Sequence, residues 1–308
     1  MKLPLLLLLL MFALPARAEL QNPPSTPTFD WKLRLAKGQK WTQTASVFSE
    51  SDSESTRFIA SLDLEFQNEV LFANSNEYVI RVTLSRCKME SRVNFGGHEP
   101  HEPDRSKFTR AFMGIPFKIK QTVRGKIVAV SGLEALIQSG RKSIEKLASS
   151  KTERKELEYF LHSADDLKDI LTKYQELALP TVPLAAENSY THLFEAYPSF
   201  QSIETVKVKS RLHSFDEQLA HFDEHGELST YTDHSEFRPV GEGEVKACEA
   251  FQGLLSGQTT VDVATGLPQS ELDFQATIKT TVINTDGSRS SYVTKKQVQV
   301  TLTTKLGS

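Results

Sequence analysis

Residues Gly114 to Ile137, GIPFKIKQTVRGKIVAVSGLEALI, contain the change of hydrophobic period that decides the fold. Within 117–123, alternate residues share one face of an extended strand, as expected for a half-buried antiparallel strand. Arg124-Gly125 then makes a turn into a return strand, 126–130. Ser131 and Glu134 then stand at the spacing of a capping box, the usual start of a helix. The stretch therefore predicts a β-hairpin that leads into a helix.

Strand patterns with the same period of two lie on both sides of this stretch. Upstream, they predict a hairpin of 31–35 with 41–47 and a second pairing of 58–66 with 78–84. Downstream, they predict a strand around Val206 and Val208, a hairpin at His225-Gly226, and a pairing of 272–282 with 298–302 across Asp286-Gly287.

Between these groups, residues of about 132–178 carry three amphipathic stripes. The third contains Leu167, Ile170, Leu171 and Tyr174 at helical spacing, and Pro180 ends it. A sheet with one apolar face must cover that face, so we expect these helices to pack on the inside of the sheet. The alternative is that the stripe is an exposed surface for a partner protein.

The predicted fold class is α+β, with predominantly antiparallel curved β-sheet and a central helical segment packed on it. Residues 29–305 form either one β-rich domain or two lobes, 29–131 and 186–305, joined by the helices 132–178. Residues 19–28, ELQNPPSTPT, predict a flexible lead-in.

Residues 1–18 have the pattern of an export signal, with Lys2, an apolar run, and the small-x-small sequence Ala16-Arg17-Ala18. The apolar run is shorter than the about 20 residues that a membrane-spanning helix needs. We therefore expect a protein without a transmembrane segment that is exported to the periplasm or the extracellular space.

Charge and motifs exclude several classes of function. Without Lys2 and Arg17, the 36 basic side chains become 34 against 39 acidic ones, a formal charge of −5, so nothing indicates a nucleic acid partner. Gly-x-Ser-x-Gly and the phosphate-binding glycine loops are absent. No catalytic residue and no cofactor is predicted.

Two histidine-containing strings have residue types that could bind a metal. His98-Glu-Pro-His101-Glu-Pro-Asp104 holds five potential metal ligands in seven residues, but its two prolines and acidic residues are typical of a solvated loop, so His98 and His101 are weak zinc or copper candidates. His221-Phe-Asp-Glu-His225 resembles a zinc-protease string, but the glutamate stands beside the wrong histidine.

Cys87 and Cys248 are the two cysteines, and both fall in predicted strands. Two cysteines in an exported chain predict a disulfide. Two separate buried thiols are the alternative.

The order of features resembles an uncharacterised family of exported bacterial proteins and lipoproteins known as a domain of unknown function. The motifs that carry the resemblance are Leu35-x-x-Gly38-x-x-Trp41, Ser131-Gly132, Leu179-Pro180-x-x-Pro183 and Gly241-x-Gly243. Where that family usually has Gly-Asp-x-Trp, this chain has Glu187-Asn188-Ser189-Tyr190. The resemblance implies the fold order and an exported protein, and no activity.

Three hypotheses for function remain. The first is an exported, non-enzymatic protein that binds an apolar ligand or a peptide. The second is a structural or interaction protein of the cell envelope, and the third is a hydrolase with an unrecognised site.

Overall fold

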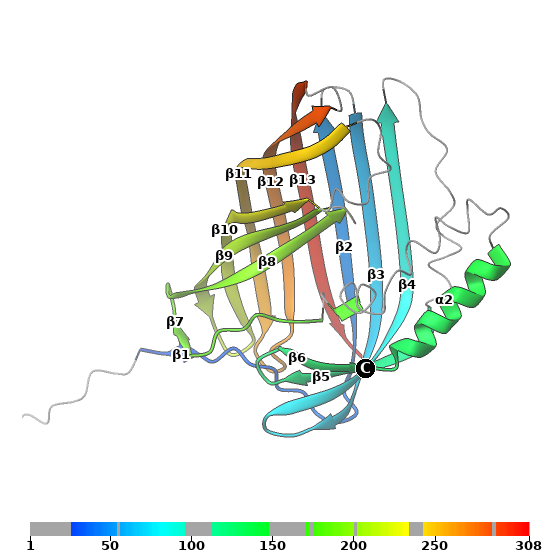
Figure 1. Ribbon diagram of the computed structural model, residues 1–308. Coiled ribbons are helices and arrows are strands. Elements are labelled where there is room, and N and C mark those ends of the chain that lie inside the picture. The colour runs from blue at the N-terminus through cyan, green and yellow to red at the C-terminus, as the bar shows by residue number, and fades with distance from the viewer. Residues whose placement is uncertain are drawn as a thin grey trace, which may run out of the picture.

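The computed structural model describes residues 26–53, 56–95, 113–147, 171–172, 175–199, 202–233, 243–284 and 288–307 (Figure 1). Its elements in chain order are β1 (Thr28–Phe29), β2 (Lys40–Ser53), β3 (Thr56–Ala73), β4 (Glu77–Phe95), β5 (Pro116–Thr122), β6 (Ile127–Ser131), α2 (Leu133–Leu147), β7 (Leu184–Ala185), β8 (Ser189–Ser199), β9 (Ser202–Phe215), β10 (Leu219–Asp233), β11 (Gly243–Asp262), β12 (Pro268–Asn284) and β13 (Arg289–Leu306).

The long strands form one 11-stranded antiparallel sheet in the order β6-β5-β4-β3-β2-β13-β12-β11-β10-β9-β8. The pairing of β2 with β13 joins the strands before the helix to those after it. The short strands β1 and β7 pair separately. The sheet has two edges, β6 and β8.

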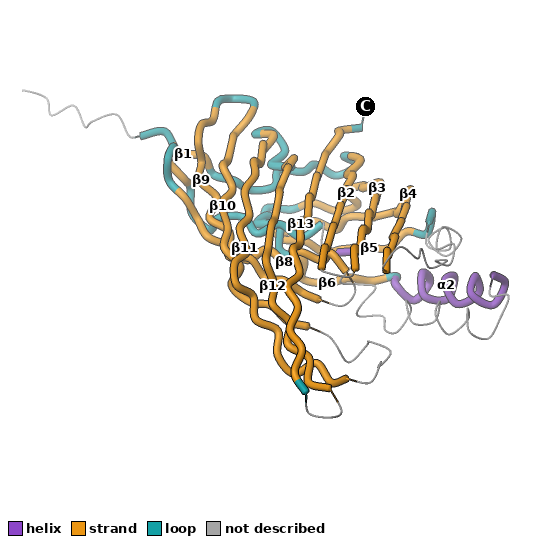
Figure 2. The backbone as a smooth tube through the Cα atoms, turned by 90° about the horizontal axis from the view of Figure 1, so that it is seen from above, coloured by secondary structure: helices purple, strands orange, loops and turns teal. Residues whose placement is uncertain are grey.

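The sheet is strongly curled. Strand β8 comes close to β2 although five strands lie between them in the sheet order. In Figure 1, β8, β9 and β10 cross in front of β13 and β2, and the view from above in Figure 2 shows the same bend. The curl turns the apolar face of the sheet inward.

Three clusters of buried side chains fill this inner face. One is centred on Phe66, Ile80 and Phe117 of β3, β4 and β5. A second lies over β9 and β11–β13 and contains Val206 and Phe274. The third is an aromatic group that includes Phe29, Trp31 and Phe222.

The hairpin predicted around Arg124-Gly125 is confirmed: β5 and β6 pair around a turn in which Gly125 has φ of 82°, a conformation that favours glycine. The pairings β3 with β4 and β12 with β13 are also confirmed. The predicted hairpin of 31–35 with 41–47 is wrong. Residues 31–35 are extended, but they bond elsewhere: the N–H of Leu33 donates to the carbonyl of Val123, and that of Arg34 to the carbonyl of Thr265.

The hairpin predicted at His225-Gly226 is also wrong, because β10 runs through both residues. The space beside Gly226 is occupied, since a Cβ atom there would lie 2.7 Å from Cγ1 of Val206. The glycine therefore permits close packing of strands, and the turn lies at 216–218, between β9 and β10.

The predicted α+β class holds only in part: the described chain is mostly antiparallel sheet with a short helix, and residues 148–170 of the predicted helical cover lie outside the described residues. Leu133 and Leu136, at the start of α2, are buried in the first cluster, and Figure 1 shows the helix then leading away from the sheet. Leu171 is buried in the same cluster, as predicted, whereas Leu167, Ile170 and Tyr174 lie outside the described residues.

Among the described residues, no helix is both long and apolar enough to cross a membrane. Residues 1–18 and the lead-in 19–25 lie outside the described part of the chain.

Candidate functional site

A broad open groove of about 1130 Å³ lies on the polar, outward face of the sheet. Seven consecutive strands, from β2 through β13, β12, β11, β10 and β9 to β8, contribute to it. Its outward-facing lining consists of Glu50, Asp52, Thr191, Lys207, Lys209, His225, Glu227, Gln252, Leu254, Ser256, Asp273, Gln275, Thr277, Lys295 and Gln297.

Strand alternation places these residues on one face. On β10, Glu224 and Gly226 are buried on the inner side, whereas His225 and Glu227 are exposed on the outer side. The register then aligns outward residues across the strands: Lys207 lies opposite Glu227, and Glu227 opposite Leu254. The groove is therefore a set of cross-strand rows rather than a loop-built site.

The charges in the groove are ordered along these rows. Strand β9 contributes Lys207 and Lys209, whose side-chain ammonium groups have no ion pair or hydrogen bond within the described chain. Acceptors gather at the other end. The amide nitrogens of Gln275 and Gln297 donate to the carboxylate of Asp273 at 3.1 and 3.2 Å.

Strand β2 extends this acceptor-rich end with Glu50 and Asp52. Glu50 accepts hydrogen bonds from the guanidinium of Arg57, with Nε at 2.8 Å and the second nitrogen at 2.7 Å. Asp52 lies opposite Lys295 in the register. The groove thus runs from cationic donors on β9 to carboxylate and amide acceptors on β12, β13 and β2.

The residue types of a serine hydrolase occur in one row of the groove, but in the wrong order. His225 lies opposite Ser256, and Ser256 lies opposite Asp273. A catalytic triad needs the histidine between the serine and the carboxylate, so that it can accept the serine proton and be oriented by the acid. Here the serine is in the middle, and Asp273 cannot orient His225.

A second polar cluster, which sequence analysis did not find, is buried on the inner face of β8, β9 and β10. The hydroxyl of Ser210 donates to Oε2 of Glu224 at 2.5 Å, and Nε2 of His192 lies 3.0 Å from the same hydroxyl. Because that hydroxyl proton is used toward Glu224, the His192 ring must donate from Nε2. Ser210 therefore links three neighbouring strands.

Burial governs the titration of this cluster. It raises the pKa of Tyr190, which stacks on His192 with ring centres 5.5 Å apart. It lowers the pKa of His192 below the ordinary 6.5, although the Glu224 carboxylate, 4.0 Å away, acts in the opposite direction. Since Ser210 is fully buried, the cluster is a structural network and not an accessible nucleophile.

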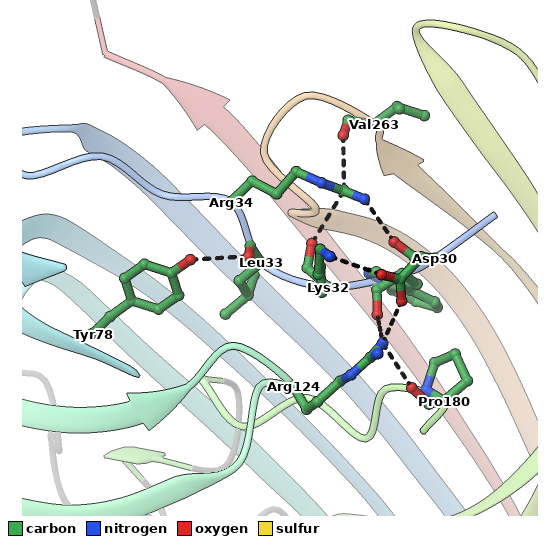
Figure 3. Close-up of polar contacts among 9 residues, drawn as sticks. Asp30, Lys32, Leu33, Arg34, Tyr78, Arg124, Pro180 and Val263 are labelled. Atoms are coloured by element: carbon green, nitrogen blue, oxygen red, sulfur yellow. Dashed lines mark hydrogen bonds and ion pairs between the residues drawn. The ribbon is translucent and has the colours of Figure 1, made fainter. Parts of the chain in front are cut away.

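Two arginines fasten the extended segment 30–35 across the inner face (Figure 3). Arg124 donates to the carbonyls of Trp31 and Pro180 at 2.8 and 3.1 Å and forms an ion pair with Asp30 at 2.8 Å. Arg34 donates to the carbonyls of Val263 and Asp30 at 3.1 and 2.7 Å. Burial favours the protonated carboxyl of Asp30, but hydrogen bonds from Lys32 and Arg124 outweigh it and lower its pKa.

The interior beneath this segment is nearly filled. Its hollow has a volume of about 10 Å³, enough for one water molecule, and is lined by Gln43, Gln121 and Gln175 among others. The side-chain nitrogen of Gln175 is buried without a hydrogen-bond partner in the described chain, which fits a bound water there. No apolar chamber is formed at this place.

No disulfide is present among the described side chains. Cys87 lies on β4 and Cys248 on β11, but the side chain of Cys248 lies outside the described residues. The Cys87–Cys248 disulfide therefore stays a prediction.

The predicted histidine candidates are not assembled into a site. His98 and His101 lie outside the described residues. Within the described chain, no group of three or more potential ligands could hold a metal ion. His221 and His225 both lie on the outward face of β10, and only His225 lines the groove.

A model of the family of unknown function DUF6263 matches residues 75–268. No curated protein sequence matches the chain. Among solved structures, one titled "Lipid-protein interactions in lipovitellin" has a TM-score of 0.48 at 8% identity, and the match covers 89% of this chain but only 26% of that one.

The outer membrane protein OprG from Pseudomonas aeruginosa gives a TM-score of 0.26 at 6% identity, over 88% of this chain and 97% of that one. An outer membrane channel from Pseudomonas putida F1 gives 0.20 at 7%, over 88% and 98%. At these TM-scores the likeness supports neither a shared fold nor a shared ligand.

Proposed function

Since the chain belongs to DUF6263, a family of unknown function, its role has to be inferred from its own geometry, and we propose that it is an exported, non-enzymatic binding protein that holds a polypeptide segment in the groove. Export through residues 1–18 to the periplasm or the extracellular space is part of this proposal.

The observation that carries the proposal is the contrast between the two faces of the sheet. In the described chain, the inner face carries three clusters of buried side chains and a hollow that has room for one water molecule, whereas the outer face has a groove of about 1130 Å³. Pockets for small apolar ligands are enclosed and lined mainly by hydrophobic and aromatic side chains. The outward lining of this groove contains no aromatic residue, and Leu254 is its one large apolar side chain.

The chemistry of the lining suits a polypeptide. Gln252, Gln275 and Gln297 offer both amide donors and acceptors, the two groups that a peptide backbone also carries. An apolar ligand would leave these groups without partners when it excluded water from them. The peptide form of the binding hypothesis is therefore favoured over the apolar-ligand form.

The sheet edges support the interaction-protein alternative. Strand β8 is an edge of the sheet, and its Leu193 is 64% exposed. Exposed edges can pair with a strand of another chain. Such a partner would bind to the backbone of β8 rather than in the groove.

Selection of random seven-residue peptides displayed on phage tests the proposal. We expect the enriched peptides to bind the protein and to lose most of this binding in Gln275→Trp, which places a large ring in the middle of the groove. Lys118→Trp, on the exposed side of β5 outside the groove, is the matched control and should bind as the wild type does.

Enriched peptides that bind Gln275→Trp and the wild type equally well would contradict the groove as the site. If proline substitutions that block strand pairing at β8 abolished their binding instead, the edge-strand alternative would replace it. A lipid extracted from the purified protein in equimolar amount would favour the apolar-ligand hypothesis.

A further inference from the structure

The order of charges in the groove indicates which segment it holds. Lys207 and Lys209 lie at the β9 end, and their ammonium groups form no ion pair or hydrogen bond within the described chain. Asp273, Glu50 and Asp52 lie toward the opposite end, on β12 and β2, where Lys295 lies opposite Asp52 and Arg57 forms an ion pair with Glu50. A ligand that complements both ends must itself be acidic at one end and basic at the other.

The middle of the groove separates these ends with neutral side chains. Gln252, Leu254 and Ser256 lie on β11, between the lysines on β9 and the first carboxylate of the acidic end, Asp273 on β12. Glu227 lies opposite Lys207 and reduces the positive charge there, so the second lysine, Lys209, contributes most of the net charge at the β9 end. His225, beside it, adds positive charge when it is protonated.

The sheet order fixes the length of the segment. From β9 to β2 there are five steps between neighbouring strands. At about 4.8 Å a step, the ends are roughly 24 Å apart along the sheet. An extended chain advances at most about 3.3 to 3.6 Å per residue, so about seven residues span this distance.

We infer that the groove binds an extended polypeptide segment of about seven residues, with an acidic end over Lys207 and Lys209 and a basic end over Asp273, Glu50 and Asp52. This inference rests on the proposed function, and adds to it the charge order, the length and the direction across the strands. The segment lies across the strands, so it does not extend the sheet by pairing with an edge.

Three labelled peptides of equal length test the charge order in titrations followed by fluorescence anisotropy. They are EEGSGKK, with separated charges; EKGSGEK, with the same composition but mixed charges; and the neutral AAGSGAA. We expect the first to bind about fivefold more tightly than the second at low salt, because two exposed ion pairs at each end give a modest gain. The difference should shrink at high salt.

The double variant Lys207→Glu, Lys209→Glu makes both ends of the groove acidic. We expect it to bind EEGSGKK less tightly than the wild type and KKGSGKK more tightly, a gain that an unfolded protein could not show. The matched control is Lys37→Glu, Lys118→Glu, which changes the net charge equally outside the groove and should preserve the wild-type order.

The results of these titrations distinguish a wrong charge order from a failure of the proposed function. If all three peptides bind the wild type equally and all lose binding in Gln275→Trp, the charge order is wrong and the groove remains the site. If no peptide shows binding that depends on Gln275→Trp, the proposed function fails, and the inference fails with it. If the control variant shifts the preference as far as the groove variant does, net charge alone explains the binding and the inference is overturned.

Discussion

Replacing Gly226 by alanine tests whether this glycine permits close packing of strands or forms a turn. The added Cβ would lie 2.7 Å from Cγ1 of Val206, 3.2 Å from Cβ of Leu255 and 3.2 Å from the carbonyl oxygen of Lys207. Contacts under 3.0 Å force a neighbour to move, and overpacking of this kind costs about 1–3 kcal/mol. We expect Gly226→Ala to lower the free energy of unfolding by about that amount.

A second substitution, Val206→Ala, should relieve this clash. Val206→Ala removes the atom at 2.7 Å and should by itself cost about 2 kcal/mol, for two buried methyl groups and the space they leave. In the Val206→Ala variant, Gly226→Ala should lower the free energy of unfolding by about 1 kcal/mol less, or by a still smaller amount, than it does in the wild type. The two effects are not additive because the two residues are in contact. Gly38→Ala is the control: its φ of 85° makes alanine strained, but nothing lies within 4 Å, so its cost should add independently.

Urea unfolding followed by tryptophan fluorescence measures all of these free energies, since Trp31 and Trp41 are both buried in the native state. The packing explanation would be refuted if Gly226→Ala lowered the free energy of unfolding equally in the wild type and in the Val206→Ala variant. It would also be refuted by a cost within error of zero, as an exposed turn would give.

Three further predictions follow from the packing and the polar clusters. Leu171→Ala should cost about 2–5 kcal/mol in urea unfolding because Leu171 is buried in the first core cluster, and an unchanged midpoint would show that it is not. Arg124→Ala should cost about 1–2 kcal/mol because two carbonyls and Asp30 lose a charged donor, and Arg124→Lys should recover less than half of that loss, whereas full recovery would mean that charge alone matters. His192 has a pKa below the ordinary 6.5, so its ring binds fewer protons in the folded state than in the unfolded state. Its contribution to the free energy of unfolding is therefore complete above pH about 6.5 and is lost as the pH falls through the folded-state pKa. In His192→Gln this part of the pH dependence of unfolding should disappear, and a profile identical to the wild type would contradict it.

Alternation along single strands was the part of the fold that the sequence could predict. Where one face of a strand is buried, as at Phe117 and Ile119 of β5, the period of two follows from the geometry of the chain alone. The turn at Gly125 was predictable for the same local reason. Each of these features depends on residues that are close in sequence.

Features that depend on distant segments could not be predicted. Trp31, Leu33 and Leu35 have the alternation of a strand, but the segment makes its backbone hydrogen bonds to residues about 90 and 230 positions away, such as Val123 and Thr265. Gly226 looks like a turn residue until its neighbours Val206 and Leu255 are known. In both cases the local pattern allowed two structures, and long-range contacts selected one.

The groove could not be predicted from the sequence for a related reason. Its side chains are the outward members of alternating strands, which in sequence are indistinguishable from any solvated face. Lys207 and Glu50 become the two ends of one site only because β13 pairs with β2 and so joins the first and last long strands in a single sheet. The order of strands therefore determines the order of charges.

The region that the family model matches contains only part of the groove. Residues 75–268 include Lys207, Lys209 and the middle of the groove on β10 and β11, but they exclude β2, β13 and all but the first residue of β12. The acidic end, with Glu50, Asp52 and Asp273, thus lies outside the matched region. The matched region therefore covers the β9 end of the groove and not the β2 end. The charge-separated specificity is a property to be tested on this chain itself, because the strands that complete it come from the two flanks that the family model does not cover.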